Sequence, residues 1–345
     1  MKTLLALDSF KGSLSASEAV AAAASALDGS ETVLLPLSDG GEGFTECMVH
    51  ALGGTFRTVQ AHDPLGRPIQ ARYGLVHEGR TAVIETSAAG GLTLLESSEL
   101  DPWNASSFGV GEMILDAVNQ QVEEIWAGLG GTAVMDAGAG MLHALGPHPL
   151  PVRIHAFFDV DVPLTGPQGA AFVFGPQKGA DAEMVRRLED RFQAIAREWI
   201  KRYGMDADRV PGAGAAGGIG AALGICLGAE MHSGIDAVLD AVGFSDRLAG
   251  CDLIITGEGK ADRQTLTGKV PYGVLQRVRE ISPNLPVVLV AGRVEDRDAL
   301  LAAGFTDVIQ VTPENERDGK GMEKPVAAAN LARAIQHFQH LRNQH

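Results

Sequence analysis

Two short loops near the start of the chain combine a cation, hydroxyls and carboxylates with glycine. The first reads Ser9-Phe10-Lys11-Gly12-Ser13 and follows the apolar run 3–7. The second reads Ser38-Asp39-Gly40-Gly41-Glu42-Gly43 and follows the apolar run 32–37. Two predicted strand ends thus place charged and polar groups in loops that precede helices, which is where open α/β sheets bind phosphorylated ligands.

The first loop offers Lys11, with the backbone N–H groups of Gly12 and Ser13, as partners for phosphate oxygens. Ser15 and Glu18 have capping-box spacing, so a helix is expected to begin directly after the loop. Helix N-termini attract anions generically, however, and a solvated loop lysine would have the same spacing. The spacing alone leaves both interpretations open.

The second loop offers Asp39 and Glu42 as ligands for Mg²⁺, which takes one or two carboxylates together with phosphate oxygens of the substrate. The glycines between them leave the backbone free to bring both carboxylates to one ion. The alternative is that Asp39 only caps the helix that follows.

A third loop, Thr256-Gly257-Glu258-Gly259-Lys260, ends the strand predicted at 252–256. It lacks the four-residue spacer of a Walker A loop. Glu258, Lys260 and Lys269 still supply an acid and two cations at the carboxyl end of a strand. We expect Glu258 and Lys269 to face a nucleotide or the transferred group, and a polar surface loop is the alternative.

A glycine turn in the middle of the chain, Gly128-Leu129-Gly130-Gly131-Thr132-Ala133, follows the strand predicted at 124–127. It matches a dinucleotide fingerprint, but Asp159 lies farther on than the acidic strand end of such a site. We interpret the turn as the entry to a helix reaching residue 144 and as a phosphate or substrate loop. Asp136, within that helix, is the candidate acceptor of a substrate proton, with a helix cap or an ion pair as the alternative.

Composition excludes several classes of protein. The chain has 345 residues, 28 Lys and Arg against 43 Asp and Glu, and a net charge of −15, with none of the basic stripe of a nucleic-acid binder. Its cysteines, Cys47, Cys226 and Cys251, lack zinc spacing and read as buried thiols. No signal peptide is indicated, and the apolar stretch 212–228 is too short to span a membrane. We expect a soluble cytoplasmic protein that binds small molecules, with its oligomeric state open.

Apolar strands alternate with helices at both ends of the chain, which predicts a parallel sheet covered on both faces. Shorter, polar-interrupted runs between residues 55 and 84 predict antiparallel hairpins instead. We therefore predict an α/β fold with a doubly wound domain made of residues 1–55 and 247–345 and an inserted α+β domain at 56–246. Long helices are expected at 182–203, 215–227, 270–281 and 327–344.

Taken in series, these segments resemble the glycerate kinase type-1 family over nearly the whole chain. The segments that carry the resemblance are 8–16, 36–43, Asp63-Pro64-Leu65-Gly66, Phe174-Gly175-Pro176-Gln177-Lys178-Gly179-Ala180, 212–220 and 255–259. The resemblance implies a Rossmann-like domain with a second domain, an active site in the cleft between them, and transfer of the γ-phosphoryl group of ATP to D-glycerate, commonly at the 2-hydroxyl. With ATP and Mg²⁺ as cofactors, the residues expected to contact the nucleotide are Ser9, Gly12, Ser13, Gly257, Gly259, Gly130 and Gly131.

The sequence also departs from the pattern of that family. Val134 and Met135 stand where the family usually has a threonine and an asparagine, and Val162 replaces another asparagine. If these positions lined the substrate pocket, they would remove hydrogen bonds that read hydroxyl groups. The alternatives are a kinase for a less polar hydroxy acid and a weakened or non-catalytic nucleotide or metabolite binder. A third alternative is a nicotinamide-dependent oxidoreductase that uses the turn 128–133.

Overall fold

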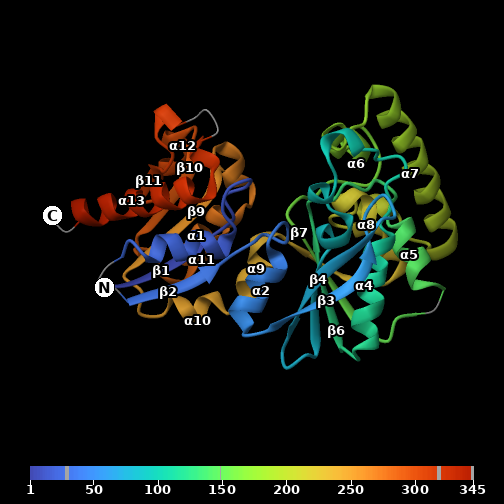
Figure 1. Cartoon of the computed structure of the whole chain (residues 1–345), viewed down its shortest axis with the longest axis horizontal. Helices are drawn as coiled ribbons and strands as arrows, with labels where there is room; N and C mark the ends of the chain where they lie inside the picture. Colours follow the sequence, from blue (N-terminus) through green and yellow to red (C-terminus); the bar gives the residue numbers. More distant parts are fainter. Residues whose placement is uncertain (28–30, 148, 317–319, 343–345) are drawn as a thin grey trace. The chain divides into compact units, whose positions relative to one another are not determined.

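The computed structural model describes residues 1–27, 31–147, 149–316 and 320–342 and has a mixed α/β architecture (Figure 1). The chain folds as two compact units, Met1–Asp39 with Gly234–His345 and Gly40–Ser233. The predicted boundaries, 55/56 and 246/247, differ from these. Helix α2 (Phe44–Leu52) packs on strands of the second unit and α9 (Gly234–Ala241) packs on a helix of the first, so each helix lies with its packing partner.

The first unit is built on five strands in the order β11-β10-β9-β1-β2, and every neighbouring pair is parallel. The strands are β1 (Lys2–Leu7), β2 (Glu31–Pro36), β9 (Leu253–Ala261), β10 (Val287–Val294) and β11 (Asp307–Gln310). The helices, besides α9, are α1 (Ala16–Ala24), α10 (Phe244–Leu248), α11 (Val270–Ile281), α12 (Arg297–Ala302) and α13 (Lys324–Arg342). The sheet confirms the parallel strands predicted at both ends of the chain.

Local signals placed several of these elements correctly. The capping box of Ser15 and Glu18 is present at the start of α1, and α11 has the predicted bounds. The predicted end of the last helix, Gln344, lies outside the described residues. Strand β9 runs on to Ala261, so the expected loop at 256–260 is wrong. The reason is that β10 also continues, and Glu258 pairs with Ala291 in register.

The second unit contains six strands in the order β3-β4-β5-β6-β7-β8, of which β3, β4 and β5 pair antiparallel and the others parallel. The strands are β3 (Thr55–His62), β4 (Pro68–Val76), β5 (Thr81–Glu85), β6 (Glu124–Leu129), β7 (Arg153–Phe158) and β8 (Glu230–Ser233). The helices, besides α2, are α3 (Ser87–Gly90), α4 (Phe108–Asn119), α5 (Ala139–Leu145), α6 (Ala170–Phe174), α7 (Ala182–Tyr203) and α8 (Ala215–Cys226). The predicted hairpins and the helix 182–203 are confirmed, whereas β8 carried no recognised signal.

Helix α5 begins at Ala139, so the helix predicted directly after the glycine turn at 128–133 is wrong. The intervening residues form an irregular segment in which Ala137 and Gly138 have φ values of +52° and +72°. Left-handed backbone of this kind interrupts a right-handed helix. Asp136 consequently lies in a loop at the N-terminus of α5.

Helix α8 is also irregular, because Ala216, Gly217 and Gly218 have left-handed backbone conformations. A Cβ atom at Gly217 would lie 1.9 Å from the Val134 carbonyl oxygen, so only glycine permits this approach. The Ala137 N–H donates a hydrogen bond to the Gly217 carbonyl at 3.1 Å. The segment after the glycine turn at 128–133 thus packs against the segment 212–220.

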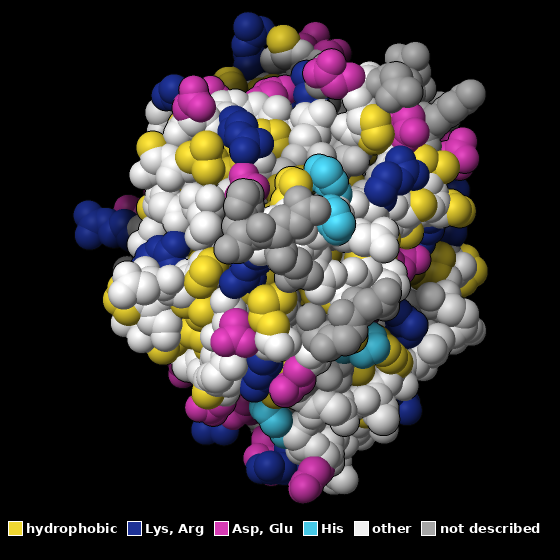
Figure 2. Space-filling view, turned by 90° about the vertical axis from the view of Figure 1, so that its left-hand side faces the viewer, with side chains coloured by type: hydrophobic (Ala, Val, Ile, Leu, Met, Phe, Trp, Pro, Cys, Tyr) yellow, Lys and Arg dark blue, Asp and Glu magenta, His cyan; other side chains and the backbone are white. Residues whose placement is uncertain are grey.

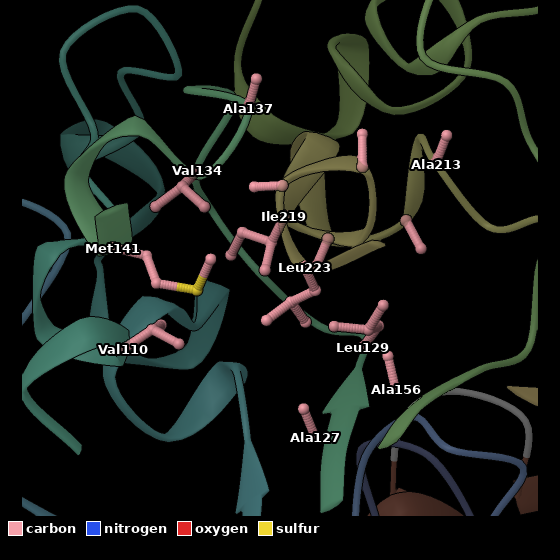
Figure 3. Packing of buried hydrophobic residues seen from close by; sticks show 14 of the residues in the cluster. Val110, Ala127, Leu129, Val134, Ala137, Met141, Ala156, Ala213, Ile219 and Leu223 are labelled. Atoms are coloured by element: carbon pink, nitrogen blue, oxygen red, sulfur yellow. The ribbon is translucent and has the colours of Figure 1, made fainter. Parts of the chain in front are cut away.

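Val134 and Met135 belong to the main hydrophobic core of the second unit and are fully buried. Figure 3 shows the Val134 side chain among apolar groups that include Val110, Met141 and Ile219. The interpretation that these two side chains strip polar groups from a substrate pocket is therefore wrong. Val134 and Met135 place apolar side chains at core positions where the family pattern has polar ones.

Charged side chains of both signs are interspersed on the face drawn in Figure 2 and do not gather into a basic patch. Among the described residues, no helix combines the length and the apolar character needed to cross a membrane.

Candidate active site

Three carboxylates lie at the carboxyl edge of neighbouring strands in the first unit. Asp8 directly follows β1, Asp39 comes shortly after β2, and Glu258 lies in β9 one residue beyond the partner of Leu7. Burial, followed by the charges of Asp39 and Glu258, raises the pKa of the Asp8 carboxyl well above its usual range. The Ser9 N–H, which donates to Asp8 Oδ1 at 2.6 Å, acts in the opposite direction. The three carboxylates therefore share one electrostatic environment.

Glu258 is 5% exposed and is held by two side chains from the segment that follows β9. The Thr265 hydroxyl donates to its Oε1 at 2.5 Å, and Lys269 Nζ lies 3.4 Å from its Oε2. Burial raises the pKa of Glu258, although both partners favour the charged form. The structure thus brings Glu258 and Lys269 together, and the expectation that they face a nucleotide or the transferred group stays a prediction.

The Lys11 loop packs against the same end of β9. A Cβ atom at Gly259 would lie 3.0 Å from the Lys11 backbone nitrogen, and one at Gly257 would lie 2.3 Å from the Val290 carbonyl oxygen. Lys11 itself is exposed, and Gly12 has a φ of +76°. The Ser13 hydroxyl is buried and has no hydrogen-bond partner among the residues that the structure describes. The loop therefore carries an exposed ammonium and an unused hydroxyl.

Asp39 and Glu42 have different carboxylate neighbours. Asp39 ends the first segment of the first unit and influences Asp8, whereas Glu42 belongs to the second unit and contributes to a raised pKa at Glu85. Burial is the main cause of that rise. Glu85 accepts hydrogen bonds from Thr45 N at 2.7 Å and from the Ser87 hydroxyl at 3.2 Å. A second pair of carboxylates, Glu42 and Glu85, therefore lies in the second unit.

The glycine turn after β6 packs against the loop that contains Glu42. A Cβ atom at Gly130 would lie 2.8 Å from Gly41 Cα, and one at Gly128 would lie 2.9 Å from the Gly40 carbonyl oxygen. Gly131 has a φ of +64° and accepts a hydrogen bond from Leu92 N at 2.9 Å. Gly130 thus allows the turn after β6 to approach the Gly41 backbone closely.

Asp136 is 8% exposed and accepts four hydrogen bonds. Its Oδ2 accepts from the N–H and hydroxyl of Ser107, both at 2.8 Å, and from Gly140 N at 3.0 Å, while its Oδ1 accepts from Gly138 N at 3.0 Å. The carboxylate therefore connects the start of α4 to the start of α5. Asp136 therefore has the geometry of a helix cap, which was the alternative role that the sequence left open.

A buried lysine, Lys178, lies next to this loop. Its Nζ donates to the Val134 carbonyl at 2.9 Å and to the Thr132 hydroxyl at 3.3 Å, and the side chain is 3% exposed. Burial lowers the pKa of Lys178 to about 7, and the Asp136 charge only partly offsets this effect. An amine with a pKa near neutrality can exchange a proton with a substrate under ordinary conditions.

Comparisons with known proteins agree with one another. The sequence model of the Glycerate kinase family matches residues 3–151 and 147–342. A glycerate kinase of Bacillus subtilis (strain 168) is 38% identical, with 91% of each chain covered. A glycerate 2-kinase of Escherichia coli (strain K12) is also 38% identical, with 86% of each chain covered. The chain belongs to the glycerate kinase family.

A solved structure extends this likeness to three dimensions. A crystal structure from Salmonella typhimurium LT2, provisionally assigned as glycerate kinase 2, matches 100% of both chains with a TM-score of 0.82 and 36% identity. As a member of the glycerate kinase family, the chain is a phosphotransferase with an alcohol group as acceptor.

Sequence reasoning missed three members of the candidate site in this glycerate kinase family chain: Asp8, Glu85 and Lys178. Asp8 directly follows β1, both of whose neighbours are parallel, and Glu85 ends β5, which is parallel to β6 and antiparallel to β4. A polar residue at the end of a strand was available as a signal for both. Lys178 has no such signal, because it lies in a 3₁₀ turn, Pro176–Lys178, far along the chain from Asp136. Its burial depends on tertiary packing.

Proposed function

We propose that this chain transfers the γ-phosphoryl group of ATP to the 2-hydroxyl of D-glycerate with the help of Mg²⁺. Membership of the glycerate kinase family and the glycerate 2-kinase relative support the choice of acid and hydroxyl. The observation that carries the proposal is the convergence of Asp8, Asp39 and Glu258 at one edge of a parallel sheet. Phosphoryl transfer depends on positioning and on neutralising charge, and this edge can supply both.

We propose that the nucleotide phosphates bind at the carboxyl edge between β1 and β9. Numbered within the first unit, its strand order is 2-1-3-4-5, the flavodoxin-like variant of a doubly wound sheet, and β1 and β9 flank the switch point. Ligands of open α/β sheets bind at this point. Lys11, the N–H groups of Gly12 and Ser13, and the Ser13 hydroxyl, which has no partner in the part of the chain that the structure describes, are then phosphate partners. A Rossmann-like description of this unit, with 40–233 as an insertion, is part of the proposal.

The carboxylates of Asp8, Asp39 and Glu258 fit Mg²⁺. Their mutual repulsion contributes to the raised pKa of Asp8, and a divalent cation would favour the ionised form. Oxygen donors are the ligands that Mg²⁺ takes. When bound, the ion neutralises charge on the phosphates. Lys269 stays with Glu258 and adds a positive charge to the same edge.

We propose that the hydroxy acid binds at the loops of the second unit, near Gly130, Gly131 and Lys178. Two groups are candidates to receive the hydroxyl proton, Asp136 and Lys178. The geometry favours Lys178, because a neutral amine that donates to Val134 and Thr132 retains a free lone pair. Asp136 then holds the loop and stabilises the ammonium that forms.

A direct assay tests the proposed function. The purified chain is incubated with ATP, Mg²⁺ and a panel of small hydroxy acids, and ³¹P NMR identifies the product. Formation of 2-phosphoglycerate from D-glycerate supports the proposal. Turnover of another acid alone would favour a different substrate, and ATP binding without turnover of any acid would favour a non-catalytic relative. Family membership leaves no support for the nicotinamide-dependent alternative.

A further inference from the structure

Three side chains of β7 and β8 bring potential metal ligands together on one face of the second sheet. His155 Nδ1 lies 3.0 Å from His232 Nε2 and 3.5 Å from Glu230 Oε2. The ligand atoms of all three residues lie within 4.8 Å of one another. None of the three belongs to the loops proposed for phosphoryl transfer.

The strand register accounts for this arrangement. His155 pairs directly with Glu230, and His232 pairs with Phe157, two residues farther along β7 on the same face. Cross-strand neighbours in a sheet hold their Cβ atoms about 5 Å apart. The backbone of the two paired strands therefore fixes the positions from which all three side chains project.

Aromatic packing limits the motion of the imidazole rings. The His232 ring stacks on Phe157 with centroids 5.0 Å apart, and on His155 with centroids 5.2 Å apart. Phe157 in turn packs against Phe44 at 5.0 Å and Trp126 at 5.8 Å. The rings thus have a rigid support beneath them.

The third ligand is accessible to solvent. The His155 side chain is 17% exposed, whereas that of Glu230 is 69% exposed. An ion can therefore reach the histidine nitrogens from the side of Glu230 and retain water as a further ligand.

We propose that His155, Glu230 and His232 bind one divalent transition-metal ion of the zinc type, with water in the remaining position. Zinc–nitrogen bonds of tetrahedral geometry separate two ligand nitrogens by about 3.3 Å, close to the observed spacing. Two imidazoles with one carboxylate suit Zn²⁺ and Co²⁺, whereas Mg²⁺ takes oxygen ligands.

Binding replaces a hydrogen bond with two metal–nitrogen bonds. In the metal-free chain one imidazole N–H donates to the other ring nitrogen, and when the ion binds that proton moves through solvent to the second nitrogen of its own ring, so both imidazoles bind as neutral ligands. The ion would link β8, the short strand at the edge of the sheet, to β7 through side chains. Since the second unit ends at Ser233, the site would stabilise the last strand of that unit.

Titration of the full chain with Co²⁺ tests the proposal. We expect one tight equivalent with the visible absorption bands of a low-symmetry site, displaced by Zn²⁺. His155→Asn and His232→Asn should each weaken this equivalent by at least about tenfold. Glu230→Gln, at an exposed position, should weaken it without threatening the fold. His62→Asn is the matched control, because His62 Nδ1 lies 2.9 Å from Glu112 in a pair of the same type outside the cluster.

A second readout locates the ion independently of affinity. Trp126 is paired with His155 across β6 and β7, so bound Co²⁺ should quench its fluorescence in the wild type and not in His232→Asn. Trp126→Phe identifies the Trp126 contribution among the three tryptophans. Equal Co²⁺ affinity of the wild type and both histidine variants would overturn the proposal, and so would equal weakening in His62→Asn. The cluster would then be only a hydrogen-bonded histidine pair. Phosphoryl transfer does not enter either readout, so this result is independent of the proposed function.

Discussion

Lys178 Nζ donates a hydrogen bond to the backbone carbonyl of Val134 at 2.9 Å. The contact uses the main chain, so it does not depend on which side chain occupies position 134. The Val134 side chain instead points into the core of the second unit (Figure 3). The departure from the family pattern at this position therefore leaves the buried lysine and its partners in place.

Val134→Thr restores the residue type usual for the family and should destabilise this chain. A hydroxyl introduced at a fully buried apolar position lacks a prepared partner, which costs about 1–3 kcal/mol. We expect a lower urea midpoint and an unchanged preference among hydroxy acids. A gain of turnover for D-glycerate, measured beside Val83→Thr as a core control, would instead show that position 134 faces the substrate.

Lys178→Met should reduce kcat/KM by about 10²–10⁴-fold, the range of a lost general acid–base group. With a pKa of about 7, Lys178 gives the wild type a rise in kcat/KM as the pH increases through neutrality, because the neutral amine is the active form. The variant should lack this rise. Lys201→Met, at the exposed end of α7, is the control. A variant that retains the same pH profile would remove Lys178 from the reaction.

The same substitution should change the pH dependence of stability. The folded-state pKa of Lys178 lies below its ordinary value, so the unfolded chain binds more protons between about pH 7 and pH 10.5. Lys178 thus lowers the free energy of unfolding below pH 7, and this destabilisation decreases as the pH rises from about 7 to 10.5. Urea unfolding at pH 6 and pH 9 should show a smaller increase in stability for Lys178→Met than for the wild type.

Much of the first unit was predictable because its strands are continuous apolar runs and its first helix carries a capping box. The end of β9 was not predictable from the sequence, since Gly257 and Glu258 have the pattern of a loop. They continue the strand only because β10 extends beside them, and no local pattern reports the length of a neighbouring strand. The position of Glu258 at the sheet edge nevertheless followed from the parallel arrangement.

The second unit was harder to predict. Asp136 was expected within a helix, yet left-handed backbone at Ala137 and Gly138 delays α5 until Ala139. That conformation depends on Gly217, whose carbonyl accepts from Ala137 N. Lys178 is buried by the same long-range packing. Such contacts join segments far apart in sequence, so propensity and spacing do not encode them locally.

Asp8→Asn should stabilise the ligand-free chain at neutral pH and abolish most of its activity. The raised pKa of Asp8 means that the folded chain binds more protons than the unfolded chain above the ordinary carboxyl range. Its charged form is therefore destabilising once the pH exceeds that range, and the penalty disappears in acid. Thermal unfolding should show a higher Tm for Asp8→Asn at pH 7 and no difference near pH 3.

The activity of the same variant addresses the metal. Losing one of three carboxylates should lower kcat by about 10²–10³-fold and raise the Mg²⁺ concentration needed for half-maximal rate. Asp252→Asn, which alters a carboxylate at the opposite end of β9, is the control. An unchanged Mg²⁺ requirement would place the ion elsewhere.

Asp136→Asn should lower turnover far more than nucleotide affinity, because Asp136 lies in the second unit and the proposed phosphate loops lie in the first. The amide group would face donors that now meet a carboxylate, so stability should also fall by about 2–4 kcal/mol. Ser107→Ala removes one of those donors and serves as the structural comparison. Stability is measured by urea unfolding and ATP affinity by calorimetry. Unchanged turnover in Asp136→Asn would refute any role in the reaction.

Ser13→Ala should leave the ligand-free chain as stable as the wild type while weakening ATP binding. The Ser13 hydroxyl is buried without a partner among the described residues, so its removal breaks no hydrogen bond and relieves a desolvated group. In the complex the hydroxyl would donate to a phosphate oxygen, and its loss should raise the KM for ATP by about tenfold, as for one hydrogen bond to a charged group. Thr256→Val removes another buried hydroxyl, within β9, that also lacks a partner in the described ranges, and should leave KM unchanged. Equal effects of the two substitutions on KM would show that Ser13 does not contact the phosphates.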